Sequence, residues 1–254
     1  MGGRWIGALL PVVLLALWEG LYHVPALRLE SVSRPTEVVR ALAAGLADGS
    51  ILLATAQTFQ AALLGFALAS VVGVAMGVVL GLAPRLERVV GPSIDAMRPV
   101  PSVALMPLAL LLFGFGVRLE VAVIAFACLW PVLIVTTAAV RDVDARLLEV
   151  AQVLRMPAAA RVFKIVLPAA MGRMAVGLQL SLGIALVVAV TVEIVLNPRG
   201  LGHAMMAAQQ ALHFDQMYAR LVWIGLTGWL VSAASQALVD RLPTVRNLRE
   251  GAAP

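Results

Sequence analysis

Charged residues are scarce in this sequence. Only 13% of its 254 residues are Asp, Glu, Lys or Arg, whereas soluble domains carry about a quarter, and 61% are hydrophobic. A soluble fold of this size could not keep that much apolar surface away from water. The composition therefore argues against an ordinary soluble enzyme or binding domain. It indicates an integral membrane protein that crosses the bilayer several times.

Lysine and cysteine are almost absent. Lys164 is the single lysine and lies between Phe163 and Ile165, so the chain lacks the Gly-Lys-Ser/Thr of a phosphate-binding P-loop. If ATP drives this protein, another subunit must bind the ATP. The single cysteine, Cys128, can form no internal disulfide. The three histidines lack paired metal-ligand spacing, and no residue set suggests a metal or redox cofactor.

Six stretches approach the length and apolarity of a membrane-spanning helix, which needs about 20 mostly apolar residues. They run over about 5–24, 52–82, 100–116, 119–140, 174–196 and 218–238. The third is short and carries Pro101 and Pro107. The first could be a signal peptide starting at Arg4, but its long apolar part and the lack of a small-x-small cleavage site favour an uncleaved helix. The sequence therefore predicts an all-α integral membrane protein with six transmembrane helices.

The basic residues orient this predicted bundle. Cytoplasmic loops carry an excess of Lys and Arg, and placing the N-terminus inside gives the inner segments roughly two-thirds of the 19 basic residues. We therefore expect both termini in the cytoplasm. The net charge of +5 does not indicate nucleic-acid binding, because the arginines lie in short gaps between apolar runs.

The predicted organisation has three parts. Residues 1–34 hold the first helix and an outer loop, residues 35–242 form the main transmembrane domain, and residues 243–254 are a cytoplasmic tail. Within the outer segment, residues 35–48 are typical of a short surface helix, with Pro35 at its start.

Glycines crowd the second apolar stretch. They are Gly65, Gly73, Gly77 and Gly81, and the last three follow a four-residue step that places them on one helix face. Small residues on one face let helices approach closely in lipid. We interpret this face as a packing surface.

The longest inner segment, residues 141–173, is too long for a plain connector. Apolar residues recur in it at helical spacing, at Leu147, Ala151, Leu154 and Ala158. Pro157 favours a break at the residue before it. We expect two short amphipathic helices, the second ending near Leu167 before Pro168, which would suit docking into a groove of a partner.

This segment resembles the EAA motif of binding-protein-dependent ABC importer permeases. That motif consists of Glu-Ala-Ala, three residues, Gly, nine residues and Ile-x-Leu-Pro. The matching positions are Glu149, Ala151, Ile165, Leu167 and Pro168. Arg155 stands at the Gly position, where a left-handed turn would be costly for it, so we expect the bend to shift to Met156–Pro157.

Further matches, from about residue 35 to 242, resemble the nitrate, sulfonate and taurine branch of that family. They are Arg98-Pro99-Val100-Pro101, Leu112-Phe113-Gly114, Trp130-Pro131, and Glu193 followed by Gly200-Leu201-Gly202.

The resemblance implies the type I ABC importer permease fold in the bacterial inner membrane. It also implies a homodimer, two ATPase subunits that hold ATP and Mg and dock on the 141–173 coupling loop, and an extracytoplasmic solute-binding protein. This chain would have no cofactor and no catalytic residue of its own. The solute implied is a small anion such as a sulfonate, taurine or nitrate.

Several polar residues lie within the apolar runs. Glu193, close to Thr191, would either make an interhelical hydrogen bond that fixes the outer end of the bundle or line and gate the solute path. Gln179 is our main candidate for a path-facing residue, although such residues often join helices. We expect Glu19 at the level of the headgroups.

Two other functions remain open from the residues alone. An ion-coupled secondary carrier could use Glu193 or Glu19 for coupling, but such carriers often show inverted repeats, and none is visible here. A membrane hydrolase could use Ser181, but no histidine is paired with it in a readable way.

Overall fold

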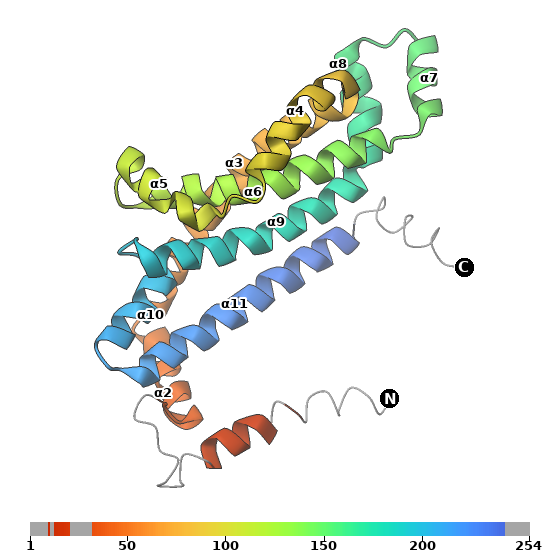
Figure 1. The fold of residues 1–254 in the computed structure, drawn as a ribbon. Helices are drawn as coiled ribbons and strands as arrows, with labels where there is room; N and C mark the ends of the chain where they lie inside the picture. The colour runs from red at the N-terminus through yellow and green to blue at the C-terminus, as the bar shows by residue number, and fades with distance from the viewer. Residues whose placement is uncertain (1–9, 11–12, 21–31, 242–254) are drawn as a thin grey trace, which may run out of the picture.

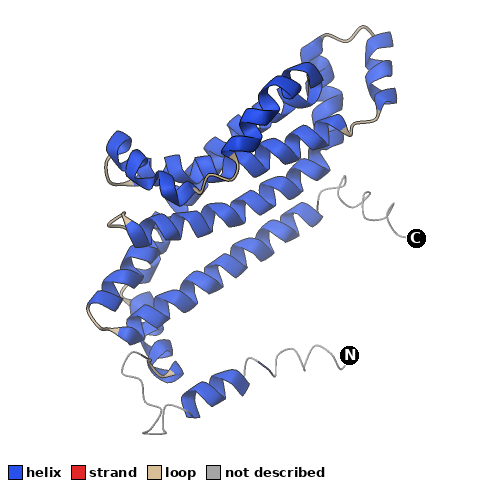
Figure 2. Ribbon diagram, viewed as in Figure 1, coloured by secondary structure: helices blue, strands red, loops and turns tan. Residues whose placement is uncertain are grey.

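Every regular element in the described part of the chain is helical (Figures 1 and 2). The computed structural model describes residues 10, 13–20 and 32–241. Four helical stretches are long and apolar enough to cross a membrane, and a bent pair of helices adds a fifth. The all-α membrane class is therefore confirmed, whereas the described residues give four or five spans rather than six. The first predicted span and the predicted tail lie largely outside these residues.

The elements in chain order are α2 (Pro35–Ala47), α3 (Ser50–Leu82), α4 (Pro84–Met97), η2 (Ser102–Leu105), α5 (Met106–Phe113), α6 (Val117–Arg141), α7 (Ala145–Val153), α8 (Ala158–Arg161), η3 (Val162–Val166), α9 (Leu167–Val195), α10 (Gly200–Gln210) and α11 (Phe214–Asp240). The predicted surface helix is α2, which begins at Pro35 with Glu37 in its first turn. Proline suits this first position because its missing N–H has no intrahelical partner there.

The predicted third span is only the second half of a broken one. Helix α4 and the η2–α5 pair together are apolar and long enough to cross a membrane, but they are bent by 84°. The break holds Pro99 and Pro101, which lack a donor N–H and restrict the residues before them. The apolar pattern did not predict α4, because charges such as Glu87 interrupt its apolar positions.

The core lies where α3, α6 and α9 pack together. A Cβ atom added to any of four α3 glycines, Gly65, Gly73, Gly77 and Gly81, would lie 2.6 to 2.9 Å from side chains of α6. The helices are therefore in contact along the glycine face, which confirms the packing interpretation. Buried residues of all three helices, including Ala61, Ile124 and Ala189, form the largest apolar cluster.

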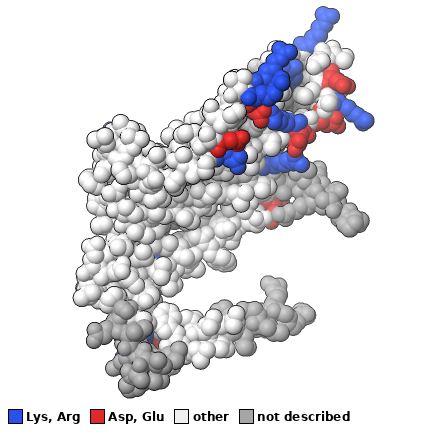
Figure 3. Space-filling model, viewed as in Figure 1, with Lys and Arg blue, Asp and Glu red and all other residues white. Residues whose placement is uncertain are grey.

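The two ends of the bundle differ in charge. Helices α7 and α8 lie at one end, and α10 and α2 lie at the other (Figure 1). Lys, Arg, Asp and Glu gather over α4 and the α7–α8 segment, while the remaining described surface in this view is almost free of charge (Figure 3). We call these the charged end and the α10 end.

Candidate functional site

The segment between α6 and α9 projects at the charged end. The predicted first short helix is α7, whose start is capped by Asp144 accepting a hydrogen bond from the Arg146 N–H at 2.9 Å. The second predicted helix does not end before Pro168. Instead, α8, the π-helical turn η3 and α9 follow one another without a break, and Pro168 lies in the first turn of α9. The π-helical turn adjusts the backbone bonding just before the proline, which lacks an N–H.

Arg155 forms the end of α7. Its φ is +48°, in the left-handed region. The Arg155 N–H donates to the Gln152 carbonyl at 2.9 Å, and the Met156 N–H donates to the Ala151 carbonyl at 3.0 Å. This bonding pattern is a Schellman motif, which favours glycine at the left-handed position. The expected shift of the bend to Met156–Pro157 is therefore wrong, because the satisfied carbonyls hold Arg155 itself in the turn.

Helix α7 has one face toward the bundle and one toward solvent. Ala151 is 1% exposed, whereas Leu154 is 65% exposed and Val153 is 82% exposed. Beneath α7, the buried Val166 belongs to a small apolar cluster that also contacts Leu148. The remaining motif residues vary in exposure. Glu149, Arg155, Pro157 and Pro168 are exposed, while Ile165 and Leu167 are partly buried.

Ion pairs hold the base of this segment. Arg141, at the end of α6, contacts Glu87 of α4 at 2.7 Å. Arg173 of α9 pairs with Asp142, directly after α6. The two pairs join α6 to its neighbours on either side of the projecting α7. Because both pairs are at least partly exposed, each contributes only modest stability.

Glu193 lies at the α10 end and is 2% exposed. Its Oε2 accepts the Gly202 N–H at 2.8 Å. The two preceding N–H groups of α10 donate to α3, Gly200 to Gln57 Oε1 at 3.0 Å and Leu201 to Thr58 Oγ1 at 2.9 Å. Helix α10 therefore begins in a set of acceptors supplied by α3 and α9. A side chain at Gly200 would overlap the Glu193 carboxyl group.

Glu193 therefore makes an interhelical hydrogen bond, one of its two predicted roles, while its role in the solute path stays a prediction. The other two predicted path residues also bond within the protein. Gln179 Nε2 donates to Gln236 Oε1 of α11 at 2.6 Å, and Thr191 Oγ1 donates to the Val187 carbonyl. The Gln179–Gln236 hydrogen bond joins α9 to α11.

The α10 end holds a second buried acid, Glu120, which was not among the predicted site residues. Glu120, in the first turn of α6, and Asn197, just after α9, are each 2% exposed. Asn197 Nδ2 donates a hydrogen bond to Glu120 Oε1. The acid inside the apolar run from Leu119 to Val123 was a readable signal. The sequence gives no local signal that Asn197 is its partner, because the two residues are 77 positions apart.

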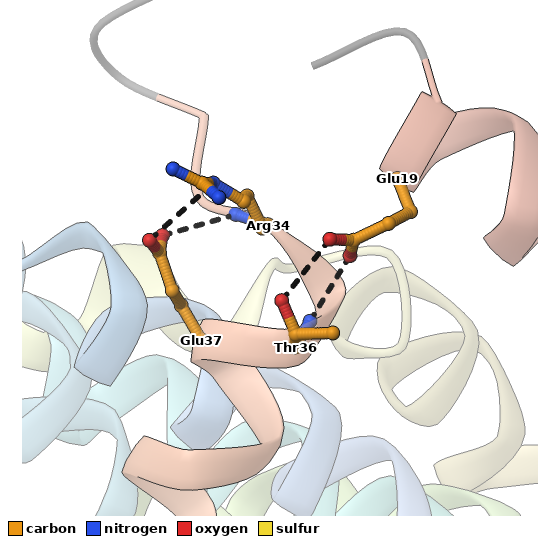
Figure 4. Close-up of polar contacts among 4 residues, drawn as sticks. All are labelled: Glu19, Arg34, Thr36 and Glu37. Atoms are coloured by element: carbon orange, nitrogen blue, oxygen red, sulfur yellow. Dashed lines mark hydrogen bonds and ion pairs between the residues drawn. The ribbon is translucent and has the colours of Figure 1, made fainter. Parts of the chain in front are cut away.

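Glu19 fixes the start of α2. It lies at the end of the helical residues 13–20 and accepts hydrogen bonds from the Thr36 N–H at 3.2 Å and the Thr36 Oγ1 at 3.1 Å (Figure 4). In the same turn, the Arg34 N–H donates to the Glu37 carboxylate, and the two side chains form an ion pair.

No group of three or more His, Cys, Asp or Glu side chains in the described ranges could hold a metal ion.

Known proteins share this architecture. A methionine ABC transporter structure in an inward-facing conformation aligns with a TM-score of 0.61 at 19% identity, covering 82% of this chain and 98% of that one. The structure of an amino acid ABC transporter with histidines aligns with a TM-score of 0.59 at 15% identity, covering 81% and 94%. The fold is therefore that of type I ABC importer permeases.

Sequence comparisons identify the family. A relative named as an aliphatic sulfonates transport permease in Bacillus subtilis is 31% identical, covering 96% of this chain and 89% of the relative. The taurine transport system permease of Escherichia coli is 29% identical, covering 91% and 86%. The nitrate import permease of Leptolyngbya laminosa is 24% identical, covering 77% and 70%. The model of the binding-protein-dependent transport system inner membrane component matches residues 65–244. The chain belongs to this family and is the membrane permease subunit of an ABC importer.

Proposed function

We propose that two copies of this chain form the membrane path of an importer for a small anion, driven by ATPase subunits that dock on the α7–α8 segment. The observation that carries the docking proposal is the exposed apolar surface of α7. Val150, Val153 and Leu154 are between 54% and 82% exposed at the end where charges gather. Apolar side chains at such a place are typical of a surface that a partner covers.

The charge distribution supports a cytoplasmic position for this segment. Lys164 and most of the inner arginines lie at or next to the charged end, and basic residues concentrate on the cytoplasmic side of membrane proteins. The ATPase would then meet α7 from the cytoplasm, while a solute-binding protein would meet the α10 end from outside. ATP and Mg belong to the ATPase in this proposal.

The solute class rests on the relatives. Those named above import aliphatic sulfonates, taurine and nitrate by their names, and each of these solutes carries an anionic group. None of the named relatives or solved structures is an ion-coupled carrier, so that alternative gains no support from them.

Copurification with the partner ATPase tests the docking proposal. Leu154→Asp would place a charge in the proposed apolar contact, and we expect roughly tenfold less ATPase to copurify in mild detergent. Leu154 is exposed, so the change should leave the fold intact. Leu212→Asp is the matched control, because Leu212 is 71% exposed at the α10 end. Equal ATPase recovery with both variants would contradict docking on α7.

A further inference from the structure

Two arginines line a cavity of about 550 Å³ at the α10 end. One wall is formed by residues 113 and 115–118, from the end of α5 to the start of α6, and the other by residues 197–199, between α9 and α10. Arg118 and Arg199, one from each wall, are its two charged lining residues, and both are exposed. The cavity thus combines two positive charges with access from the surface.

Neither guanidinium has an ion pair or side-chain hydrogen bond with any residue of the described ranges, whereas Arg141 and Arg173 at the charged end are paired. The acidic group that Arg199 influences electrostatically is Glu120, which is buried and already bonded to Asn197. The hydrogen-bonding capacity of both arginines is therefore available to a ligand.

The buried Glu120–Asn197 hydrogen bond brings the chain segments that carry the two arginines together. Arg118 lies two residues before Glu120 and Arg199 lies two residues after Asn197, and the Glu120–Asn197 hydrogen bond joins the two connections beneath the cavity. Each buried polar residue therefore anchors the chain next to an exposed arginine. This arrangement holds the positions of both arginine backbones before any ligand arrives.

The start of α6 adds further attraction for an anion. Helix α6 begins at Val117, and Gly116 before it has a φ of +118° and offers no side-chain cap. Both residues line the cavity. The first N–H groups of a helix lack intrahelical partners and carry a partial positive charge. The first turn of α10, by contrast, already donates to Gln57, Thr58 and Glu193.

We propose that this cavity is a receiving site for a small organic oxyanion. The anionic head would lie between Arg118 and Arg199, whose planar guanidinium groups can each bind two oxygens. Phe115, 65% exposed and also in the cavity wall, would contact a short apolar tail. The proposal rests on the proposed function in taking the solute to be an anion, and it narrows the class to oxyanions with an apolar part, such as short alkanesulfonates.

Fluorine NMR tests the site directly, with 3,3,3-trifluoropropane-1-sulfonate as the probe. The full-length chain, purified with its ATPase in neutral detergent, should broaden the probe signal in a saturable way. Arg118→Gln or Arg199→Gln should each weaken the apparent affinity about two- to fivefold, as expected for an exposed charge pair, and the double variant should weaken it further. Trifluoropropanol, which lacks the anionic head, should show no dependence on the arginines.

The control variant is Arg40→Gln, which removes an arginine from a separate cavity at the same end of the bundle and should not change binding. Unchanged probe affinity in the double variant would overturn the proposal. So would loss of a bound solute-binding protein with probe affinity retained, because the arginines would then serve protein docking. Recovery of the ATPase from the same preparations reports separately on the proposed function, since neither arginine lies near α7.

Discussion

At the scale of single residues, the end of α7 depends on the backbone conformation of Arg155. Arg155 occupies a left-handed position that its sequence context would assign to glycine. The motif predicted the position of the turn, whereas the residue that bends is Arg155 and not Met156. The cost of a left-handed arginine is about 1 kcal/mol, and two satisfied carbonyls at the end of α7 are enough to offset it.

Replacing Arg155 by glycine should therefore stabilise the end of α7. We expect amide exchange in residues 145–156 to slow by roughly fivefold, because glycine adopts the left-handed region without the steric cost. Arg155→Ala is the matched variant, since it shortens the side chain but keeps the Cβ atom and so the steric cost of the left-handed backbone. Hydrogen–deuterium exchange with mass spectrometry measures both, and an equal effect of glycine and alanine would show that the turn is not strained.

At the scale of helices, the apolar pattern predicted the long spans well. Helices α3, α6 and α11 extend within a few residues of their predicted limits, because continuous apolar runs leave little choice of position in a membrane. The apolar pattern did not predict the helices correctly where charged residues or prolines interrupt the apolar runs. Charges interrupted α4, and the π-helical turn η3 carried the helix through Pro168. Contacts such as Glu120–Asn197 depend on tertiary packing and leave no local pattern.

The α3–α6 contact provides a prediction at this scale. A Cβ at Gly77 would lie 2.6 Å from the Cβ of Thr136, so Gly77→Ala should force the helices apart and destabilise the bundle by about 1–3 kcal/mol. Gly183→Ala on α9 meets no atom within 4 Å and should be neutral or stabilising, as alanine favours helix. Thermal stability in detergent, followed by size-exclusion chromatography, compares the two, and equal melting would refute close packing at Gly77.

At the scale of the whole molecule, the two ends differ in their surfaces and in the bonds that hold them. The charged end presents α7 with exposed apolar residues, and the α10 end presents two arginines that line a cavity. The α10 end is held by buried bonds from Glu193 and Glu120, whereas exposed ion pairs hold the base of α7. In the proposed importer, this difference would suit a path whose outer end is fixed and whose inner end receives force from the ATPase.

The orientation of the ends can be measured by cysteine labelling. Cys128 is fully buried, so the native chain should give little background with a maleimide that cannot cross membranes. If the α10 end faces outward, as proposed, Leu212→Cys should label in intact cells. Val153→Cys should label only after the cells are permeabilised. Labelling of Val153→Cys in intact cells would place α7 outside and contradict the charge-based orientation.

The most direct test of the central claim is solute uptake into proteoliposomes. The purified chain would be reconstituted alone or with its ATPase and binding protein, and offered labelled taurine, ethanesulfonate and nitrate. The account predicts uptake only when all three components and ATP are present, and its loss in Leu154→Asp. Uptake by the chain alone, driven by an ion gradient, would contradict it.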